Sequence, residues 1–352
     1  MFSILTTTAI RATGRFARLA PLALTCGLAG QVASAQAVEW TFNNNFAPQR
    51  IESGVIRDFA ADVEKRSNGD LKIRVIEGGG MGLPDADALR WMQQGTPQLG
   101  AIFVPFLGRD APELATLYVY GLITTVAEHE KALPTVKEIL REGMSKWNVE
   151  PIGFIGLSPI EQSIFCRQPV KTLEDLRKVK LRVGTRDQIE TFTAVGVAAQ
   201  FIPQNDLYAA MQTGVVDCAL YPARDIHTLS LQEVAKHAIA TAMPTSPIPY
   251  VIMTNKDEFE KLSPESQKAL QDAFAETEKQ TFDFSKVEEV ETASREKLTA
   301  MGITFYGDLP EADQQALRDA AKVTWKKIMT DAGDEALEIR RRISEALGIP
   351  VE

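Results

Sequence analysis

Histidine and cysteine, the side chains that most often hold metals or act in catalysis, are scarce in this sequence. The 352 residues contain 3 of each. His129 lies in a Glu-His-Glu stretch that lacks the second histidine of a zinc-binding H-E-x-x-H helix. His227 and His237 have no cysteine nearby, and Ser158 lacks the second glycine of a G-x-S-x-G nucleophile turn. We therefore expect no enzyme, no cofactor and no metal site.

Acidic residues are absent from the N-terminal segment, where none precedes Glu39. This segment carries positive charges at Arg11, Arg15 and Arg18. An apolar run at 19–30 follows, and then Ala33-Ser34-Ala35, which has the form of a signal-peptide cleavage site. The run is shorter than the ~20 apolar residues that a spanning helix needs. The sequence therefore predicts a signal peptide at 1–35 and a periplasmic mature protein.

Basic residues are outnumbered, with 38 Lys and Arg against 47 Asp and Glu and a net charge of −9. Cleavage would remove three arginines and no acid, so the mature chain would be still more acidic. Nucleic-acid binding needs a basic face, and so does docking on anionic lipid. We expect neither kind of partner.

Only Cys166 and Cys218 remain after the predicted cleavage. An oxidising compartment permits a disulfide between them. Nothing in their spacing requires one, and the sequence alone favours two separately buried thiols.

Strand patterns alternate with helix patterns in two regions of the chain, which predicts an α/β fold with two domains. The first region contains strand-like stretches at 38–42, 71–76 and 99–104, and the second contains them at 180–183 and 217–221. A short proline-rich passage from Pro244 to Pro249 leads into another strand and reads as a crossover between the domains. The predicted boundaries are 36–158 continued at 247–285 for domain I, and 159–246 continued at 286–352 for domain II.

A long helical stretch begins at Ser263-Pro264, where serine caps and proline occupies the first turn. No proline or glycine follows until Gly302. The residues are compatible with one long helix that spans both domains and with two helices separated by a kink near Phe282.

Arg182 is the strongest binding candidate that the residues themselves indicate. It lies at the end of a predicted strand, in Lys180-Leu181-Arg182-Val183, and Thr185 and a predicted helix follow. Ligands of open α/β sheets bind beyond the carboxyl ends of strands, and a guanidinium holds a carboxylate through two parallel hydrogen bonds. Backbone N–H groups near Thr185 would add favourable partial charge. The alternative is an ordinary surface arginine.

An ordered set of motifs in this chain resembles the solute receptors of TRAP transporters, the tripartite ATP-independent periplasmic carriers of the DctP type. The set consists of the helix, turn and strand at 59–73, then Leu173-Glu174-Asp175-Leu176, Lys180-Leu181-Arg182-Val183, Ala210 to Asp217, and Leu262 to Gln267. The resemblance covers nearly the whole predicted mature chain.

The resemblance implies a two-domain periplasmic solute-binding fold with crossing strands and a long domain-spanning helix. It also implies a ligand held between domains that close over it, and delivery to the membrane subunits of a TRAP transporter. Within this pattern Arg182 would hold the substrate carboxylate, Tyr221 would face the cleft, and Asn45 would be a polar contact. We expect the receptor to be a monomer.

The ligand class rests on departures from the family pattern and on aromatic residues. Glu161 lies near a position where sialic-acid-binding members carry a second arginine. Phe103, Phe106, Tyr221 and Tyr250 would lie near the cleft, unless they belong to the core. Together these features suggest a monocarboxylate with an apolar or aromatic portion.

Two other functions use the same features differently. One is an extracytoplasmic partner that presents a ligand to a membrane sensor, and the other is a periplasmic enzyme on the same scaffold. The missing catalytic constellation counts against the enzyme.

Cleavage after Ala35 is directly testable. We expect the protein recovered from the periplasm to have the intact mass of a chain that begins at Gln36, because the A-x-A site is read by signal peptidase. A chain that still carries Met1, or one lipidated on Cys26, would contradict this prediction.

Overall fold

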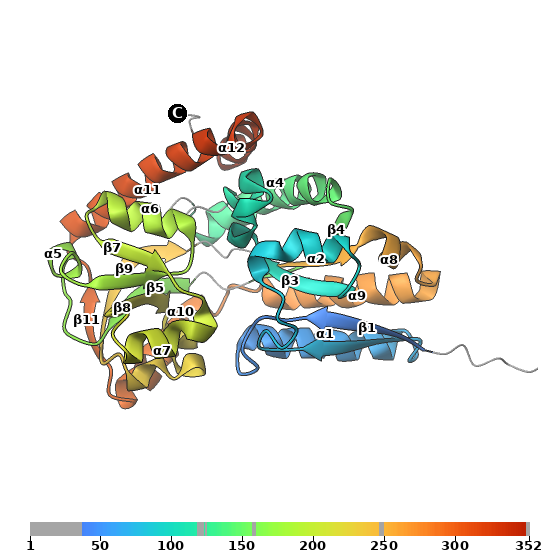
Figure 1. The fold of residues 1–352 in the computed structure, drawn as a ribbon, viewed down its shortest axis with the longest axis horizontal. Helices are drawn as coiled ribbons and strands as arrows, with labels where there is room; N and C mark the ends of the chain where they lie inside the picture. Colours follow the sequence, from blue (N-terminus) through green and yellow to red (C-terminus); the bar gives the residue numbers. More distant parts are fainter. Residues whose placement is uncertain (1–36, 118–122, 124, 157–159, 246–249, 350–352) are drawn as a thin grey trace, which may run out of the picture. The chain divides into compact units, whose positions relative to one another are not determined.

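Two β-sheets organise the chain (Figure 1). The computed structural model describes residues 37–117, 123, 125–156, 160–245 and 250–349, and these belong to one compact unit. The predicted signal peptide lies outside the described residues. Among the residues described, no helix combines the length and apolarity needed to cross a membrane.

The first sheet has the strand order β2-β1-β3-β10-β4. Its strands are β1 (Val38–Asn43), β2 (Leu71–Ile76), β3 (Leu99–Phe103), β4 (Val149–Ile155) and β10 (Tyr250–Asn255). Strands β1, β2 and β3 are parallel, whereas β10 runs antiparallel to β3 and β4. The carboxyl ends of β1 and β3 therefore lie at the same edge as the start of β10.

Helices cover both faces of the first sheet, and together they form the first lobe. These helices are α1 (Ile51–Arg66), η1 (Asp85–Asp87), α2 (Ala88–Gln93), η2 (Val104–Arg109), α3 (Pro112–Ala115), α4 (Val126–Ser145), α8 (Lys256–Glu260) and α9 (Pro264–Thr281). Helices α1 and α9 bury Phe59 and Phe274 against one face, where the two rings stack. Helices α2 and α4 pack against the other face.

The second sheet has the strand order β11-β9-β5-β8-β6-β7. Its strands are β5 (Ile160–Cys166), β6 (Lys180–Val183), β7 (Ala198–Phe201), β8 (Cys218–Pro222), β9 (His237–Thr245) and β11 (Thr304–Asp308). The helices of this second lobe are α5 (Leu173–Leu176), α6 (Arg186–Ala194), η3 (Gln204–Asp206), α7 (Leu207–Gln212), η4 (Ala223–Leu229), η5 (Leu231–Glu233) and α10 (Val287–Ala300). One core lies on each face of the sheet.

The chain crosses between the sheets more than once. It leaves the first sheet after β4 and enters the second at β5, and it returns from β9 to β10. Strands β5 and β9 are neighbours in the second sheet, while β4 and β10 are neighbours in the first. This arrangement confirms the predicted two-domain α/β fold with crossing strands.

The predicted single domain-spanning helix is wrong. Helix α9 ends at Thr281 and α10 begins at Val287, so the alternative with a break near Phe282 is confirmed. Asp283 accepts hydrogen bonds from the backbone N–H and the hydroxyl of Ser285, and such local bonds compete with helical ones. Phe282 and Phe284 also pack around the buried ring of His129, which fixes the break.

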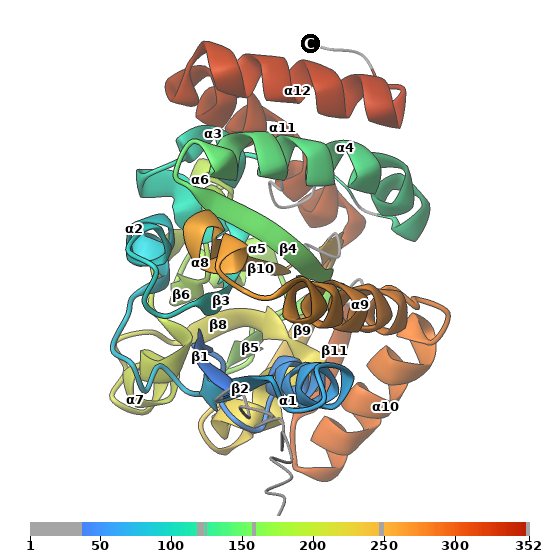
Figure 2. The same ribbon diagram turned by 90° about the vertical axis from the view of Figure 1, so that its right-hand side faces the viewer.

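Two helices complete the chain, α11 (Glu311–Ala332) and α12 (Asp334–Leu347). Figure 2 shows α12 beside α11 and over α4. Leu317 of α11 belongs to the second lobe's core, whereas Trp325 and Met329 belong to the core of the first lobe. Helix α11 therefore bridges the lobes, and α12 packs with the first lobe although its residues were predicted to continue domain II. The predicted domain boundaries otherwise stay a prediction.

Cys166 and Cys218 form a disulfide, so the preference for two separate thiols is wrong. The two residues lie directly opposite each other on the antiparallel strands β5 and β8. Their separation of 52 residues along the chain concealed this pairing.

We expect reduction of this disulfide to lower the free energy of unfolding by roughly 4 kcal/mol, because a crosslink that closes a loop of this length restricts the unfolded chain. Urea unfolding of the oxidised and reduced protein measures the effect. A Cys166→Ala/Cys218→Ala variant should unfold near the reduced midpoint and no longer respond to reductant. Equal midpoints for oxidised and reduced wild type would contradict the prediction.

Candidate functional site

Arg182 projects from β6 into the interior of the second lobe. Its side chain is buried, Nε donates to the carbonyl of Ile202 at 2.9 Å, and Nη1 lies 3.4 Å from the carbonyl of Leu220. The guanidinium lies 5.5 Å from the centre of the Tyr221 ring. Among the described residues it forms no ion pair with an acid.

Burial lowers the pKa of Arg182, Tyr221 opposes this shift and the nearby Arg50 adds to it, and together these effects bring the pKa to about 10. The side chain still carries its charge at neutral pH. A buried charge without a counter-ion is unfavourable. The arrangement is therefore suited to an incoming anion, and a carboxylate matches the planar guanidinium.

Thr185 lies at the N-cap of α6, three residues after Arg182. Its hydroxyl is buried, and within the described residues it has no hydrogen-bond partner. The backbone N–H of Gly184 donates to Oε1 of Gln188 at 2.8 Å. Both the guanidinium and this hydroxyl thus retain hydrogen-bonding capacity at the carboxyl end of β6.

Tyr221, at the end of β8, lies between Arg182 and the first lobe. Its hydroxyl oxygen accepts a hydrogen bond from Nη1 of Arg50 at 2.8 Å and lies 3.3 Å from Oε1 of Gln204. Burial raises the pKa of Tyr221, so the phenol stays protonated. The ring contacts Arg182 and the hydroxyl contacts the first lobe, which places Tyr221 where the lobes meet.

Asn45 lies on the first lobe, after β1. Its Nδ2 donates to the carbonyl of Leu83 at 3.0 Å and to Asp85 at 2.6 Å, and burial raises the pKa of Asp85. Its backbone carbonyl accepts from Gln204 of the second lobe at 3.3 Å. Its Oδ1 has no partner in the described part of the chain. Asn45 therefore lies at the lobe boundary with one free acceptor.

Tyr250 and Phe103 lie opposite each other on β10 and β3, with ring centres 5.3 Å apart. Phe46 meets Tyr250 edge to face at 4.5 Å, and Phe106 meets Phe103 at 5.3 Å. Phe201 of the second lobe lies 6.3 Å from Phe106. These five residues, which we call the aromatic wall, cross the lobe boundary. Burial raises the pKa of Tyr250, whose hydroxyl makes no hydrogen bond to a described residue.

Glu161 remains a prediction. Its backbone belongs to β5, opposite Pro244 of β9, but its side chain lies outside the part that the structure describes.

Sequence reasoning missed a group of four charged residues at the same boundary. Arg50 and Glu52 flank the start of α1, while Arg224 and Asp225 begin η4, and all four are buried. Burial raises the pKa of Asp225, whereas Arg50 and Arg224 hold the pKa of Glu52 low despite its burial. From the sequence alone, each pair is typical of a solvent-exposed helix start. The feature that could have indicated a site is that each pair closely follows the carboxyl end of a strand.

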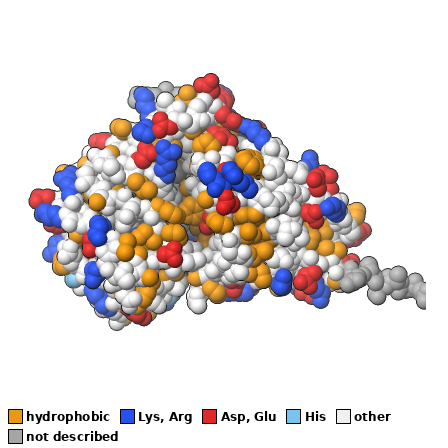
Figure 3. All heavy atoms as spheres, in the orientation of Figure 1, with side chains coloured by type: hydrophobic (Ala, Val, Ile, Leu, Met, Phe, Trp, Pro, Cys, Tyr) orange, Lys and Arg blue, Asp and Glu red, His pale blue; other side chains and the backbone are white. Residues whose placement is uncertain are grey.

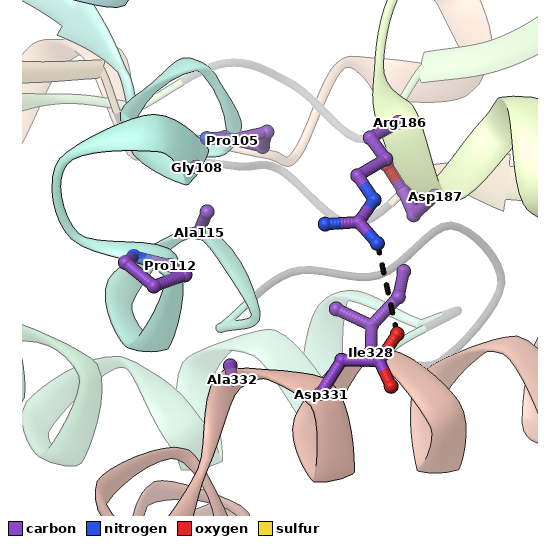
Figure 4. Close-up of a pocket in the computed structure, with 9 residues that line it drawn as sticks. All are labelled: Pro105, Gly108, Pro112, Ala115, Arg186, Asp187, Ile328, Asp331 and Ala332. Carbon is purple, nitrogen blue, oxygen red and sulfur yellow. Dashed lines mark ion pairs between the residues drawn. The ribbon is translucent and has the colours of Figure 1, made fainter.

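A recess lies beside α6 and α11, away from these residues (Figure 4). Pro105, Gly108, Pro112 and Ala115 form its apolar side, and Arg186 points into it and pairs with Asp331 at 3.7 Å. Figure 3 shows apolar side chains gathered along the middle of the face in view. The recess contains none of the predicted site residues. Within the described residues, no cluster of three or more His, Cys, Asp or Glu side chains could hold a metal ion.

The two-lobed α/β fold with crossing strands, which holds a buried and unpaired arginine in its second lobe, fits a solute-binding receptor. Residues 42–332 match the DctP family, described as bacterial extracellular solute-binding protein, family 7. The chain belongs to this family, which confirms the predicted TRAP-type receptor class and its location in the periplasm.

Relatives and solved structures agree with this assignment. A solute-binding protein of Albidiferax ferrireducens is 29% identical over 281 residues, which span 77% of this chain and 80% of that protein. The structure of DctP7 of Bordetella pertussis, a receptor that binds pyroglutamic acid, has a TM-score of 0.78 at 21% identity and covers 89% of this chain and 100% of its own. A TRAP periplasmic solute-binding protein of Rhodoferax ferrireducens with bound malonate has a TM-score of 0.75 at 23% identity, covering 88% and 98%.

Replacement of Arg182 tests its role. Arg182→Ala should weaken carboxylate binding at least tenfold and up to about a thousandfold, because truncating one partner of a buried charged pair costs about 2–5 kcal/mol. Arg182→Lys should recover only part, since an ammonium lacks the planar fork. Calorimetry with an acid found by screening measures the affinities.

Arg186→Ala is the matched control, because Arg186 is four residues away and exposed. It should bind as wild type does. Binding by Arg182→Ala within threefold of wild type would show that Arg182 is not the anchor.

Proposed function

We propose that this receptor binds a small monocarboxylate with an apolar or aromatic portion between its lobes and delivers it to the membrane subunits of a TRAP transporter. The observation that carries this proposal is the charge pattern at the boundary. Three described arginines lie buried there, and Arg50 and Arg224 are paired with acids whereas Arg182 is not. One unpaired positive charge matches one carboxylate.

The aromatic wall supports the second half of the proposal. Phe46, Phe103, Phe106, Phe201 and Tyr250 offer ring faces from both lobes, and aromatic groups contribute large apolar contact areas. The free hydroxyls of Thr185 and Tyr250 would orient a polar group on the ligand. The proposed ligand site consists of Arg182, Thr185 and the aromatic wall, together with Asn45, Tyr221 and Glu161. None of these residues is proposed to form or break a covalent bond in the ligand. No observation favours the enzyme or the sensor partner over the receptor.

The two similar structures frame the test, because pyroglutamic acid carries one carboxyl group and malonate carries two. We expect at least one monocarboxylate in a panel that includes pyroglutamic and benzoic acids to raise the melting temperature, because binding to the native state alone stabilises it by about 2.7 kcal/mol at a hundredfold excess over Kd. Methyl esters of the active acid should have no effect. Dicarboxylates of the same chain length should raise the melting temperature less than the active monocarboxylate does.

Arg182→Ala provides the control for specificity, since it should respond to no acid in the panel. A dicarboxylate that stabilises the protein more than every monocarboxylate would overturn the proposed ligand class. An ester as effective as its acid would overturn the carboxylate itself.

A further inference from the structure

Four charged side chains, two from each lobe, meet in the interior next to Tyr221. Arg50 and Glu52 come from the start of α1 in the first lobe, and Arg224 and Asp225 from η4 in the second. Their exposed fractions are 6%, 0%, 8% and 1%. Because buried charges are costly unless paired, their pairing determines how the lobes meet.

Within each lobe the charges already cancel. Arg50 holds Glu52 through two hydrogen bonds of 2.9 Å, from Nε to Oε2 and from Nη2 to Oε1. In the second lobe Nε of Arg224 lies 3.6 Å from Oδ2 of Asp225. Each lobe thus contributes one neutral ion pair.

Across the boundary the same four charges pair a second time. Nη2 of Arg50 lies 3.2 Å from Oδ2 of Asp225, and Nη2 of Arg224 lies 3.3 Å from Oε1 of Glu52. Arg50 also donates to the hydroxyl of Tyr221 at 2.8 Å. Positive and negative groups therefore alternate, and every cross-lobe ion pair joins charges that already have an opposite charge within their own lobe, although Nε of Arg224 and Oδ2 of Asp225 make no hydrogen bond among the described residues.

We propose that Arg50, Glu52, Arg224 and Asp225 form a reversible latch that holds the lobes together independently of any ligand, and that Arg50 acts through Tyr221 as a positioning residue. Separating the lobes leaves two neutral pairs instead of four isolated charges, so opening avoids the penalty of an unpaired buried ion. The same separation frees the Tyr221 hydroxyl from Arg50. The hydroxyl of Tyr221, whose ring lies beneath the Arg182 guanidinium, then keeps its contact with Gln204 of its own lobe but loses its tie to the first lobe.

The latch has a consequence for affinity, and this part rests on the proposed receptor function. A ligand that binds the closed arrangement has an apparent Kd equal to its intrinsic Kd divided by the closed fraction. A latch that keeps part of the ligand-free population closed therefore tightens binding without touching the ligand.

The test replaces one lobe's complete pair, because this change removes the cross-lobe contacts and leaves no unpaired charge. In ligand-free protein, pulsed electron spin resonance between labels at Lys72→Cys and Lys178→Cys reports the distance between the lobes. Arg50→Met/Glu52→Gln should shift the distances to longer values. The control Lys268→Met/Asp272→Asn removes an exposed pair on α9 and should match wild type.

Tyr221→Phe removes one cross-lobe hydrogen bond and no charge, so it keeps the proposal testable if the double variant fails to fold. It should shift the distances to longer values by a smaller amount. Adding Tyr221→Phe to Arg50→Met should cause no further shift, because Arg50→Met already removes the hydrogen bond to Tyr221. Unchanged distances in Tyr221→Phe and in the folded double variant would overturn the latch.

The affinity arm uses pyroglutamic acid as the probe. If the closed fraction falls tenfold, Arg50→Met/Glu52→Gln should bind this acid about tenfold more weakly. If wild type does not bind pyroglutamic acid, the ligand class needs revision while the ligand-free distances still decide the latch. Shifted distances with unchanged affinity for a bound acid would overturn the positioning role.

Discussion

The positive charge of Arg182 is held inside the protein by two backbone carbonyls and the face of a tyrosine ring, with no acidic side chain among the described residues to neutralise it. Much of the surrounding structure follows from this arrangement. Parallel strands bring Arg182 of β6 and Tyr221 of β8 to one edge of the second sheet. The crossing of the chain into the first sheet brings Tyr250 beside Phe103. The result is a cation in the second lobe and an aromatic wall to which the first lobe contributes four rings and the second lobe contributes Phe201.

The other buried charges at the lobe boundary, unlike Arg182, are all paired with opposite charges. Arg50 and Arg224 are satisfied by Glu52 and Asp225 both within and across the lobes. Their neutrality leaves Arg182 as the distinguishing charge, because a second unpaired cation would favour a second carboxylate. Because each lobe also contains an ion pair of its own, the proposed opening would leave each of these charges near an opposite one.

Local patterns predicted much of the fold. The strand 71–76 and the strand 180–183 were predicted with the bounds that β2 and β6 have, because alternation and flanking turns are properties of neighbouring residues. The same reasoning missed β7 and β11, whose short stretches carry a weak pattern. It also left open whether α9 and α10 are one helix or two, because no proline or glycine marks the break. Helix α9 ends because Asp283 forms local hydrogen bonds and because Phe282 and Phe284 pack on His129, which lies more than 150 positions earlier in the chain.

By itself the sequence determined the two-domain α/β architecture, the family and the position of Arg182 at a strand end, since each depends on residues close together in the chain. The tertiary structure decided the disulfide between Cys166 and Cys218, the packing of α12 on the first lobe and the meeting of Arg50 with Asp225. These contacts join residues 52 to 175 or more positions apart, and their geometry comes from how the sheets and helices pack. A charge pair such as Arg224-Asp225 reads the same in sequence whether water or another lobe surrounds it, and only burial distinguishes the two cases.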